Sequence, residues 1–232
     1  MNRKTLAAAF PHTVPVLMGY LSIGVVFGWM LSAAGFAPTW AAVMSSTIYA
    51  GSGQYLGVEL LANASPLGDA AFLTLIINFR HLVYGLSMLE KFKGMGWRKL
   101  YMIFSLTDET YALLAGVEAP EGVDKRDFYF TIALLDHLYW IAGSIIGAVA
   151  GALITINTEG IDFAMTALFL VIAVEQWQSN DRHAPVYLGA AGTLGCLLLF
   201  GPDNGRFLIR ALAILVAGLL VMRPRLEGGA AQ

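Results

Sequence analysis

The sequence predicts an all-α, polytopic membrane protein, and two observations support that fold class. Of the 232 residues, 57% are hydrophobic and 13% are charged, with a mean hydropathy of +0.66, whereas soluble domains carry roughly 25% charged residues. Apolar runs of the length that a helix needs to cross about 30 Å of hydrocarbon recur along the whole chain. We therefore expect a single transmembrane domain over residues 1–232, with little chain left for a soluble domain.

Helix-stopping residues divide the chain into about eight apolar segments, of which the last three are short. Before the first segment, Pro11 and His12 interrupt the apolar run, and we expect a short polar entry there rather than a signal peptide. The expected segments are 14–34, 38–63, 69–89, 99–117, 128–153, 161–178, 185–200 and 206–222.

The second segment departs from a smooth span. Hydroxyl side chains, two glycines and an amide fill its middle, between Ser45 and Gln54, and we expect a broken or re-entrant helix. Backbone freed by such a break is tolerated at membrane depth only where protein or a water-filled cavity satisfies it, so the break is a candidate pocket. A re-entrant second segment leaves seven crossings instead of eight. The distribution of lysine and arginine does not decide between these counts, and the break favours seven.

The third segment holds a charge, Arg80, near its middle. A guanidinium at bilayer depth costs between about 3 kcal/mol and more than 10 kcal/mol, so it is normally kept for function and faces protein or water. Asp108 or Glu109 in the fourth segment is the expected partner, because both lie near the centre of an adjacent segment. The alternative is a static ion pair that only orders the helices.

Other polar groups accompany Arg80 at depth. Helical spacing places Asn78 and His81 on one face of the third segment, about 100° from Arg80. His81 is a residue type that titrates near neutrality and could carry a coupling proton; a neutral His81 bonded to Asn78 or to a backbone carbonyl is an equal alternative. Asp136, inside the fifth segment, is a further candidate for charge pairing or proton coupling.

Several classes of protein and site are not expected. The net charge of −2, without a basic block, does not fit a nucleic-acid partner. The single cysteine, Cys196, cannot form an internal disulfide or a thiolate cluster, and no glycine-rich loop ends in Gly-Lys-Ser or Gly-Lys-Thr, which excludes an ATP-driven motor. We expect no cofactor, no metal and no catalytic residue, since an intramembrane enzyme needs a nucleophile with a base or a metal set. Gly143, Gly147 and Gly151 predict close helix packing.

Four short motifs carry a resemblance to a known family. They are Gly24–Gly28, Tyr49–Gln54, Asn78–Gly85 and Thr107–Ala112, one in each of the first four segments. With these motifs the chain resembles the AzlC-type family of bacterial branched-chain amino acid exporters, most strongly in its N-terminal half. The resemblance implies a permease in the bacterial cytoplasmic membrane that exports branched-chain or similar apolar amino acids by secondary transport, usually with a small AzlD-type membrane subunit.

A binding site for an amino-acid zwitterion is a hypothesis that fits these residues. A zwitterion needs a cationic or helix-N-terminal site for its carboxylate and acceptors for its ammonium, and discontinuous helices near the bilayer midplane supply both. We expect the broken segment to hold the substrate and an acidic residue to balance Arg80 and exchange a proton. Two alternatives remain, a carrier of another small solute and a non-catalytic assembly subunit. The expected substrate-binding residues are Gly51, Ser52, Gly53, Gln54, Asn78, Arg80 and His81, and the expected charge-pairing or proton-coupling residues are Arg80, His81, Asp108, Glu109 and Asp136.

Overall fold

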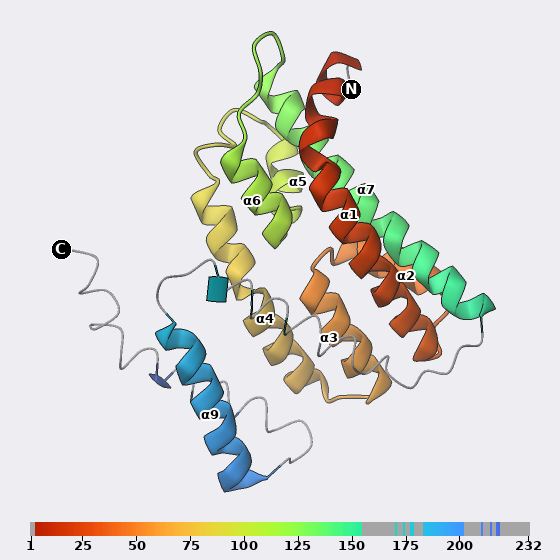
Figure 1. The fold of residues 1–232 in the computed structure, drawn as a ribbon, viewed down its shortest axis with the longest axis vertical. Helices are drawn as coiled ribbons and strands as arrows, with labels where there is room; N and C mark the ends of the chain where they lie inside the picture. The colour runs from red at the N-terminus through yellow and green to blue at the C-terminus, as the bar shows by residue number, and fades with distance from the viewer. Residues whose placement is uncertain are drawn as a thin grey trace, which may run out of the picture. The chain divides into compact units, whose positions relative to one another are not determined.

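The computed structural model describes residues 3–154, 170, 174, 177–178, 183–201, 210, 214 and 217–218. Every regular element in these residues is a helix, as predicted (Figure 1). The chain forms two compact units, residues 1–64 with 70–159 and residues 65–69 with 160–232. In the second unit, helix α9 (Ala184–Phe200) matches the expected segment 185–200. The expected segments 161–178 and 206–222 lie outside the described residues apart from isolated positions.

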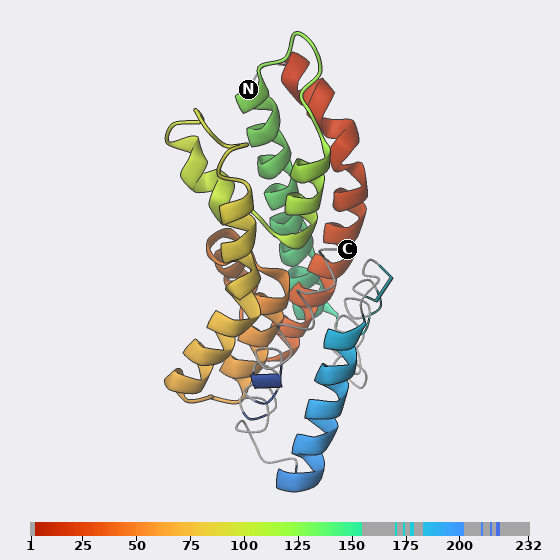
Figure 2. The ribbon, with the colours of Figure 1, turned by 90° about the vertical axis from the view of Figure 1, so that its left-hand side faces the viewer.

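Three helices of the described chain are long and apolar enough to cross a membrane. They are α1 (Arg3–Ala33), α4 (Leu67–Ser87) and α7 (Lys125–Leu153). Figures 1 and 2 show α1 and α7 side by side along most of their length. The shorter helices of the first unit pack against α1 and α7.

Helix α1 begins earlier than the sequence suggests. It is continuous from its first turn through Pro11 and Pro15, so the expected polar entry is wrong. Ala9 and Thr13 in this half are fully buried, and Thr13 Oγ1 lies 3.0 Å from the Tyr139 hydroxyl of α7. A proline inside a helix costs about 3 kcal/mol, and packing of the buried face against α7 offsets that cost.

Helices α1 and α7 pack backbone against backbone. A Cβ atom on Gly28 would stand 2.0 Å from the Ser144 carbonyl oxygen, and one on Gly147 would stand 2.0 Å from the Val25 carbonyl oxygen. No side chain fits at these distances, so both positions need glycine for the close approach. This contact confirms that the predicted glycine face of α7 is a packing surface.

The second apolar segment is broken, as predicted. Helix α2 (Pro38–Thr47) and helix α3 (Gly51–Ala62) are separated by a short turn in which Tyr49 has a φ of +44°, a strained conformation for a bulky residue. At 1.5 Å per residue, the two helices are about 15 and 18 Å long, and neither crosses about 30 Å of hydrocarbon. Helix α2 packs against the C-terminal halves of α1 and α7, and α3 packs against α1 (Figure 1), so the segment folds back on itself as a helical hairpin.

The fourth apolar segment is also a hairpin, and the expectation of one continuous segment over 99–117 is wrong. It forms helix α5 (Arg98–Phe104) and helix α6 (Asp108–Gly116). Arg98 forms an ion pair with Asp127 in the first turn of α7. The segment therefore starts at the end of the unit where α7 begins.

The chain also leaves this second hairpin at that end. Lys91, which precedes α5, donates to the Val117 carbonyl oxygen just after α6 at 2.8 Å. Figure 2 shows the hairpin in the opposite half of the unit from α2 and α3. The break does not lower the hydropathy averaged over a window of the sequence, but Thr107 followed by two acidic residues is a helix-start pattern. In the structure, the Thr107 side chain accepts a hydrogen bond from the Thr110 amide.

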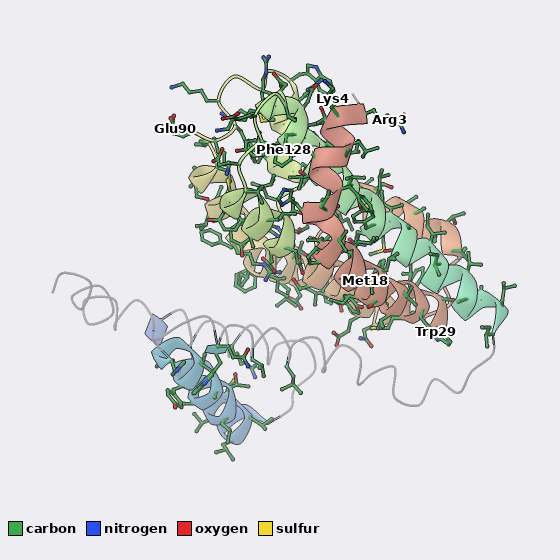
Figure 3. The ribbon with its side chains drawn as sticks, turned by 45° about the horizontal axis from the view of Figure 1, so that its top comes forward. Arg3, Lys4, Met18, Trp29, Glu90 and Phe128 are labelled. Carbon is green, nitrogen blue, oxygen red and sulfur yellow. The ribbon has the colours of Figure 1, made fainter. Side chains whose placement is uncertain are left out.

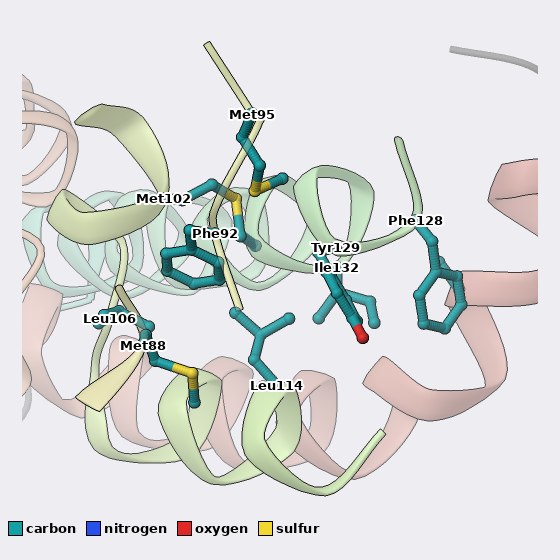
Figure 4. Packing of buried hydrophobic residues seen from close by; sticks show 11 residues of the cluster. Met88, Phe92, Met95, Met102, Leu106, Leu114, Phe128, Tyr129 and Ile132 are labelled. Carbon is teal, nitrogen blue, oxygen red and sulfur yellow. The ribbon is translucent and has the colours of Figure 1, made fainter. Parts of the chain in front are cut away.

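An apolar cluster holds the α5–α6 hairpin against α7. Its members come from the first turns of α1 and α7, from α5 and α6, and from the chain that precedes α5, and each is at most 5% exposed. Figure 4 shows these side chains converging. Their close packing sets the depth at which the chain between α5 and α6 turns. The members are Ala9, Met88, Phe92, Met95, Met102, Leu106, Leu114, Phe128, Tyr129, Ile132 and Ala133.

The two hairpins meet inside the unit at their turns. The Tyr49 hydroxyl lies 3.4 Å from Thr110 Oγ1, and the Tyr49 ring centre is 6.2 Å from that of Phe104. His137 of α7 stacks on Tyr49 at 4.1 Å, and its Nε2 lies 3.0 Å from the Ser45 carbonyl oxygen. These contacts hold Tyr49 in its strained conformation and bring the first turns of α3 and α6 together.

Basic side chains gather at one end of this unit. Figure 3 shows Arg3, Lys4 and Glu90 at that end and Trp29 toward the opposite end. The connections at the opposite end, residues 34–37 and 63–66, carry no lysine or arginine. Apart from Arg80, every lysine and arginine between residues 3 and 154 belongs to the first end: Arg3, Lys4, Lys91, Lys93, Arg98, Lys99, Lys125 and Arg126.

Candidate functional site

Arg80 and Asp108 form an ion pair between α4 and the first residue of α6. Arg80 Nη1 lies 2.7 Å from Asp108 Oδ2, and Arg80 Nη2 donates to Ser52 Oγ at 2.6 Å. Tyr84, one helical turn after Arg80, donates to the other carboxylate oxygen of Asp108 at 2.7 Å. The side chains of Arg80 and Asp108 are 30% and 36% exposed, so the pair is only partly buried. Of the two expected partners, the structure places Asp108 at Arg80.

Asn78 and Arg80 both face the first turn of α3. A Cβ atom on Gly53 would stand 2.9 Å from Asn78 Nδ2 and 3.0 Å from Asn78 Oδ1, so the glycine lets Asn78 lie against the helix. The N-cap residue of α3, Ala50, provides no side-chain cap, and the amides of such a first turn carry the positive end of the helix dipole. Within the described chain, Asn78 Oδ1 and Arg80 Nε are buried without a hydrogen-bond partner. We call Ser52, Gly53, Asn78, Arg80 and Asp108 the Arg80 site.

The Arg80 site suits a small molecule that carries both signs of charge. It holds one cation, one anion and a helix N-terminus that attracts anions. The two unpartnered atoms add a free acceptor on Asn78 and a free donor on Arg80. Because the site is neutral overall, a bound zwitterion would leave its net charge unchanged.

Three other expected binding residues lie outside this group of contacts. Gln54 is fully buried in the core, where its Oε1 accepts from Trp140 Nε1 at 2.8 Å. Gly51 faces the same tryptophan, because its Cβ would stand 3.7 Å from Trp140 Cη2. His81 is half-buried on α4, with its ring centre 6.0 Å from that of Tyr84. Gly51 and Gln54 therefore shape the break from the core side.

Glu109 belongs to a different network from Asp108. Its Oε2 accepts from the Tyr20 hydroxyl at 2.9 Å, and that hydroxyl also forms a hydrogen bond with Thr107 Oγ1. Nothing in the sequence marks Tyr20 or Thr107 as functional, because each is a lone hydroxyl in an apolar run. Glu109 and Tyr20 open onto a cleft of about 360 Å³, whose other lining residues are His12, Pro15, Val16, Gly19, Ile23 and Leu113.

Asp136 and His137 are buried in separate networks. Asp136 Oδ2 accepts from Thr110 Oγ1 at 3.0 Å. The Ser45 carbonyl can only accept, so His137 Nε2 donates to it, and His137 Nδ1 then accepts from the Tyr101 hydroxyl at 3.0 Å. A neutral His137 is therefore satisfied at both nitrogens. Among the described residues, no three His, Cys, Asp or Glu side chains gather as a metal ion would require.

A family model and a named relative both indicate the same family. The family model described as AzlC protein matches residues 15–154. The branched-chain amino acid transport protein AzlC of Bacillus subtilis (strain 168) is 41% identical over 232 residues, covering 98% of this chain and 91% of that protein. An uncharacterized membrane protein of Helicobacter pylori (strain J99) is 41% identical over 224 residues, covering 97% of both chains. The inner membrane protein YgaZ of Escherichia coli (strain K12) is 26% identical over 81% of this chain and 79% of its own. No solved structure matches the chain.

Proposed function

This chain belongs to the AzlC family of membrane proteins, and from that premise we propose that it exports branched-chain or similar apolar amino acids across the bacterial cytoplasmic membrane by secondary transport, in exchange for protons. The name of the Bacillus subtilis relative supports the substrate class. The family and the apolar helices of the described chain support a non-enzymatic carrier in a lipid bilayer.

The observation that carries the proposal is the charge arrangement of the Arg80 site. The substrate carboxylate binds Arg80 and the first-turn amides of α3, while the substrate ammonium binds Asp108 and the free oxygen of Asn78. An amino acid thus replaces one internal ion pair with two intermolecular ones. The site is neutral before and after binding, so no unpaired charge is left at membrane depth.

The position of the site between two hairpins supports a transport cycle. Ser52 belongs to the hairpin α2–α3, and Asp108 belongs to the hairpin α5–α6, which enters from the opposite end. Withdrawal of either hairpin would uncover the site toward one end only. Alternating access around a fixed central site requires that property.

We propose that the basic end of the unit faces the cytoplasm. Loops rich in lysine and arginine stay on the cytoplasmic side of bacterial membranes, and the opposite connections in this unit carry neither residue. With both hairpins re-entrant, the lysine and arginine pattern of residues 3–154 becomes consistent with one orientation.

We propose that a small AzlD-type membrane subunit works with this chain, on the ground of its family membership. Vesicles that contain the chain with and without the co-expressed subunit test the proposal. A higher rate of leucine export with the subunit present supports it, and equal rates contradict it.

Leucine counterflow in proteoliposomes tests the transport function. Vesicles loaded with unlabelled leucine should concentrate labelled leucine, and isoleucine, valine and methionine should compete. Arg80→Gln should lower counterflow by about tenfold or more, because a charged hydrogen bond contributes about 1.5–3 kcal/mol. Lys93→Gln is the control, since Lys93 is 79% exposed and pairs only with Glu90 in the described residues. Failure of all four amino acids to compete would contradict the substrate class.

A further inference from the structure

We propose that five side chains form a proton relay between the cleft and the buried centre of α7, and that the relay holds one proton shared by its two carboxylates. The inference rests on the proposed function, because it identifies the path of the coupling proton. The relay residues, in spatial order, are Glu109, Tyr20, Thr107, Thr110 and Asp136.

The relay is an unbroken chain of four oxygen contacts. The Tyr20 hydroxyl bridges Glu109, at 2.9 Å, and Thr107. Thr107 Oγ1 lies 3.1 Å from Thr110 Oγ1, and Thr110 Oγ1 lies 3.0 Å from Asp136 Oδ2. Every contact is within hydrogen-bond distance, so a proton can pass along the chain without a water molecule.

The relay needs one proton more than its three hydroxyl groups supply. The three hydroxyls, on Tyr20, Thr107 and Thr110, provide three protons for four contacts. With both carboxylates ionised, one contact would join two oxygens that have no proton between them. A fourth proton, on Glu109 or on Asp136, fills all four contacts.

Both directions of the relay satisfy every hydroxyl group. Each threonine hydroxyl has one proton to donate and two lone pairs to accept with. With the fourth proton on Glu109, Thr107 accepts from Tyr20 and from the Thr110 amide and donates to Thr110. With it on Asp136, Thr107 accepts from the Thr110 hydroxyl and amide and donates to Tyr20. The two states have the same number of hydrogen bonds.

Switching between the two states moves one proton. The Glu109 carboxyl gives its proton to the Tyr20 oxygen as each hydroxyl passes its own proton to the next oxygen, and Asp136 receives the last one. One O–H bond breaks and one forms at each hydroxyl, and the negative charge moves from Asp136 to Glu109. No oxidant or second reactant is needed.

The two ends of the relay have different surroundings. Glu109 opens onto the cleft that His12 also lines, so solvent can deliver or remove a proton there. Asp136 is fully buried, and its Oδ1 has no hydrogen-bond partner in the part of the chain that the structure describes. That atom is available to pass the proton onward when the neighbouring helices move.

Other titratable groups surround the relay. Asp108 and the Arg80 guanidinium act electrostatically on Glu109, and Asp136 acts electrostatically on Tyr49 and Tyr101. The Tyr49 hydroxyl, 3.4 Å from Thr110 Oγ1, is a side branch at Thr110 and does not reach the cleft. Both nitrogens of His137 are already engaged with Ser45 and Tyr101. Of the groups around Asp136, the Thr110 hydroxyl therefore offers the connected route toward the cleft.

The experiment compares pH-driven leucine movement with leucine counterflow in the same proteoliposomes, because counterflow moves no net proton. Thr110→Val removes the hydroxyl at constant shape and should lower the ratio of pH-driven flux to counterflow by about tenfold or more, as loss of a positioned proton-transfer group does. Thr110→Ser keeps the hydroxyl and should restore the ratio. A Thr110→Val ratio within about twofold of the wild type would overturn the relay, whereas loss of counterflow in the wild type would overturn the proposed function instead.

Infrared spectroscopy of a second pair of variants tests the relay without measuring transport. At neutral pH, infrared spectra of the wild type should show the band of a protonated carboxyl group. Tyr20→Phe should shift this band. Tyr55→Phe, which removes a different tyrosine hydroxyl with its own hydrogen bond, should leave the band in place. The double variant Glu109→Gln with Asp136→Asn should lack the band. A wild type without the band, or a double variant that keeps it, contradicts the shared proton.

Discussion

Asp108 and Glu109 are consecutive residues whose carboxylates belong to separate networks: Asp108 lies 2.7 Å from Arg80, and Glu109 accepts from Tyr20 at 2.9 Å. Successive side chains on a helix point about 100° apart, so the first turn of α6 serves both networks at once. In the proposed transporter this turn is the physical link between substrate and proton, because any shift of α6 changes both contacts.

Arg80 and Asp108 should stabilise the protein only when both residues are present. Asp108→Asn leaves a partly buried guanidinium uncompensated and should lower the free energy of unfolding by about 2 kcal/mol, less than the 3–5 kcal/mol of a fully buried pair because about a third of each side chain is exposed. The double variant Arg80→Met with Asp108→Asn should recover most of that loss. Thermal unfolding in detergent measures the difference.

Leucine counterflow distinguishes binding from a purely structural role in the same variants. The double variant should fold and lack counterflow, since neither charge of the substrate has a partner. Full counterflow in the double variant would show that the polar centre only orders the helices.

The contact between α1 and α7 should not tolerate a single added methyl group. Gly147→Ala would place a Cβ 2.0 Å from the Val25 carbonyl oxygen, so the two helices must separate, at a cost of about 1–3 kcal/mol or more. Gly19→Ala on α1 is the matched control, because nothing lies within 4 Å of its Cβ. A thermal midpoint for Gly147→Ala equal to that of Gly19→Ala would rule out the close approach.

Glu118 should make the basic end sensitive to acid. Hydrogen bonds from Tyr129, Lys125 and Lys91 lower the pKa of Glu118 from 4.5 to about 2. A depressed pKa stabilises the folded state above the unfolded value, and that contribution is lost as the pH falls from about 4.5 to about 2. The thermal midpoint of the wild type should therefore fall more over this range than that of Glu118→Gln.

Salt and a neighbouring residue provide the controls for that prediction. The Glu118 and Lys125 side chains are 69% and 57% exposed, so added salt should reduce the difference between wild type and Glu118→Gln. Glu121→Gln changes the same loop but none of the contacts of Glu118, and it should keep the acid sensitivity. Identical acid profiles for wild type and Glu118→Gln would contradict the assignment.

Cysteine labelling should show that the α5–α6 hairpin enters and leaves on one side. In a Cys196→Ser background, Lys93→Cys and Glu121→Cys should react with an impermeant maleimide only after permeabilisation of the cells, because both flank the hairpin at the basic end. Asn63→Cys, between α3 and α4, should react in intact cells. Labelling of Lys93→Cys and Glu121→Cys from opposite sides would show that residues 99–117 cross the membrane.

Hydropathy and helix-stopping residues were sufficient to predict α4, α7 and the first break, but not the start of α1. The expected segments 69–89 and 128–153 agree with α4 and α7 within a few residues. A run of about twenty apolar residues has the length and composition of a helix that crosses a bilayer. The polar residues between Ser45 and Gln54 marked the first hairpin, since a break at depth needs glycines and hydroxyls. The second hairpin was missed because its turn, Ser105–Thr107, has no glycine or proline.

Residue type and position along the apolar segments are enough to predict which polar groups lie at membrane depth, because their cost there is a property of each residue and of its distance from the segment ends. How those groups pair depends on the packing of the helices. It placed Asp108 at Arg80 and Glu109 at Tyr20, drew Gln54 into the core, and joined three hydroxyl groups into a path toward Asp136. Hydrogen bonds act over about 3 Å, so these pairs depend on where the turns of the two hairpins meet. The sequence of one segment does not specify that position.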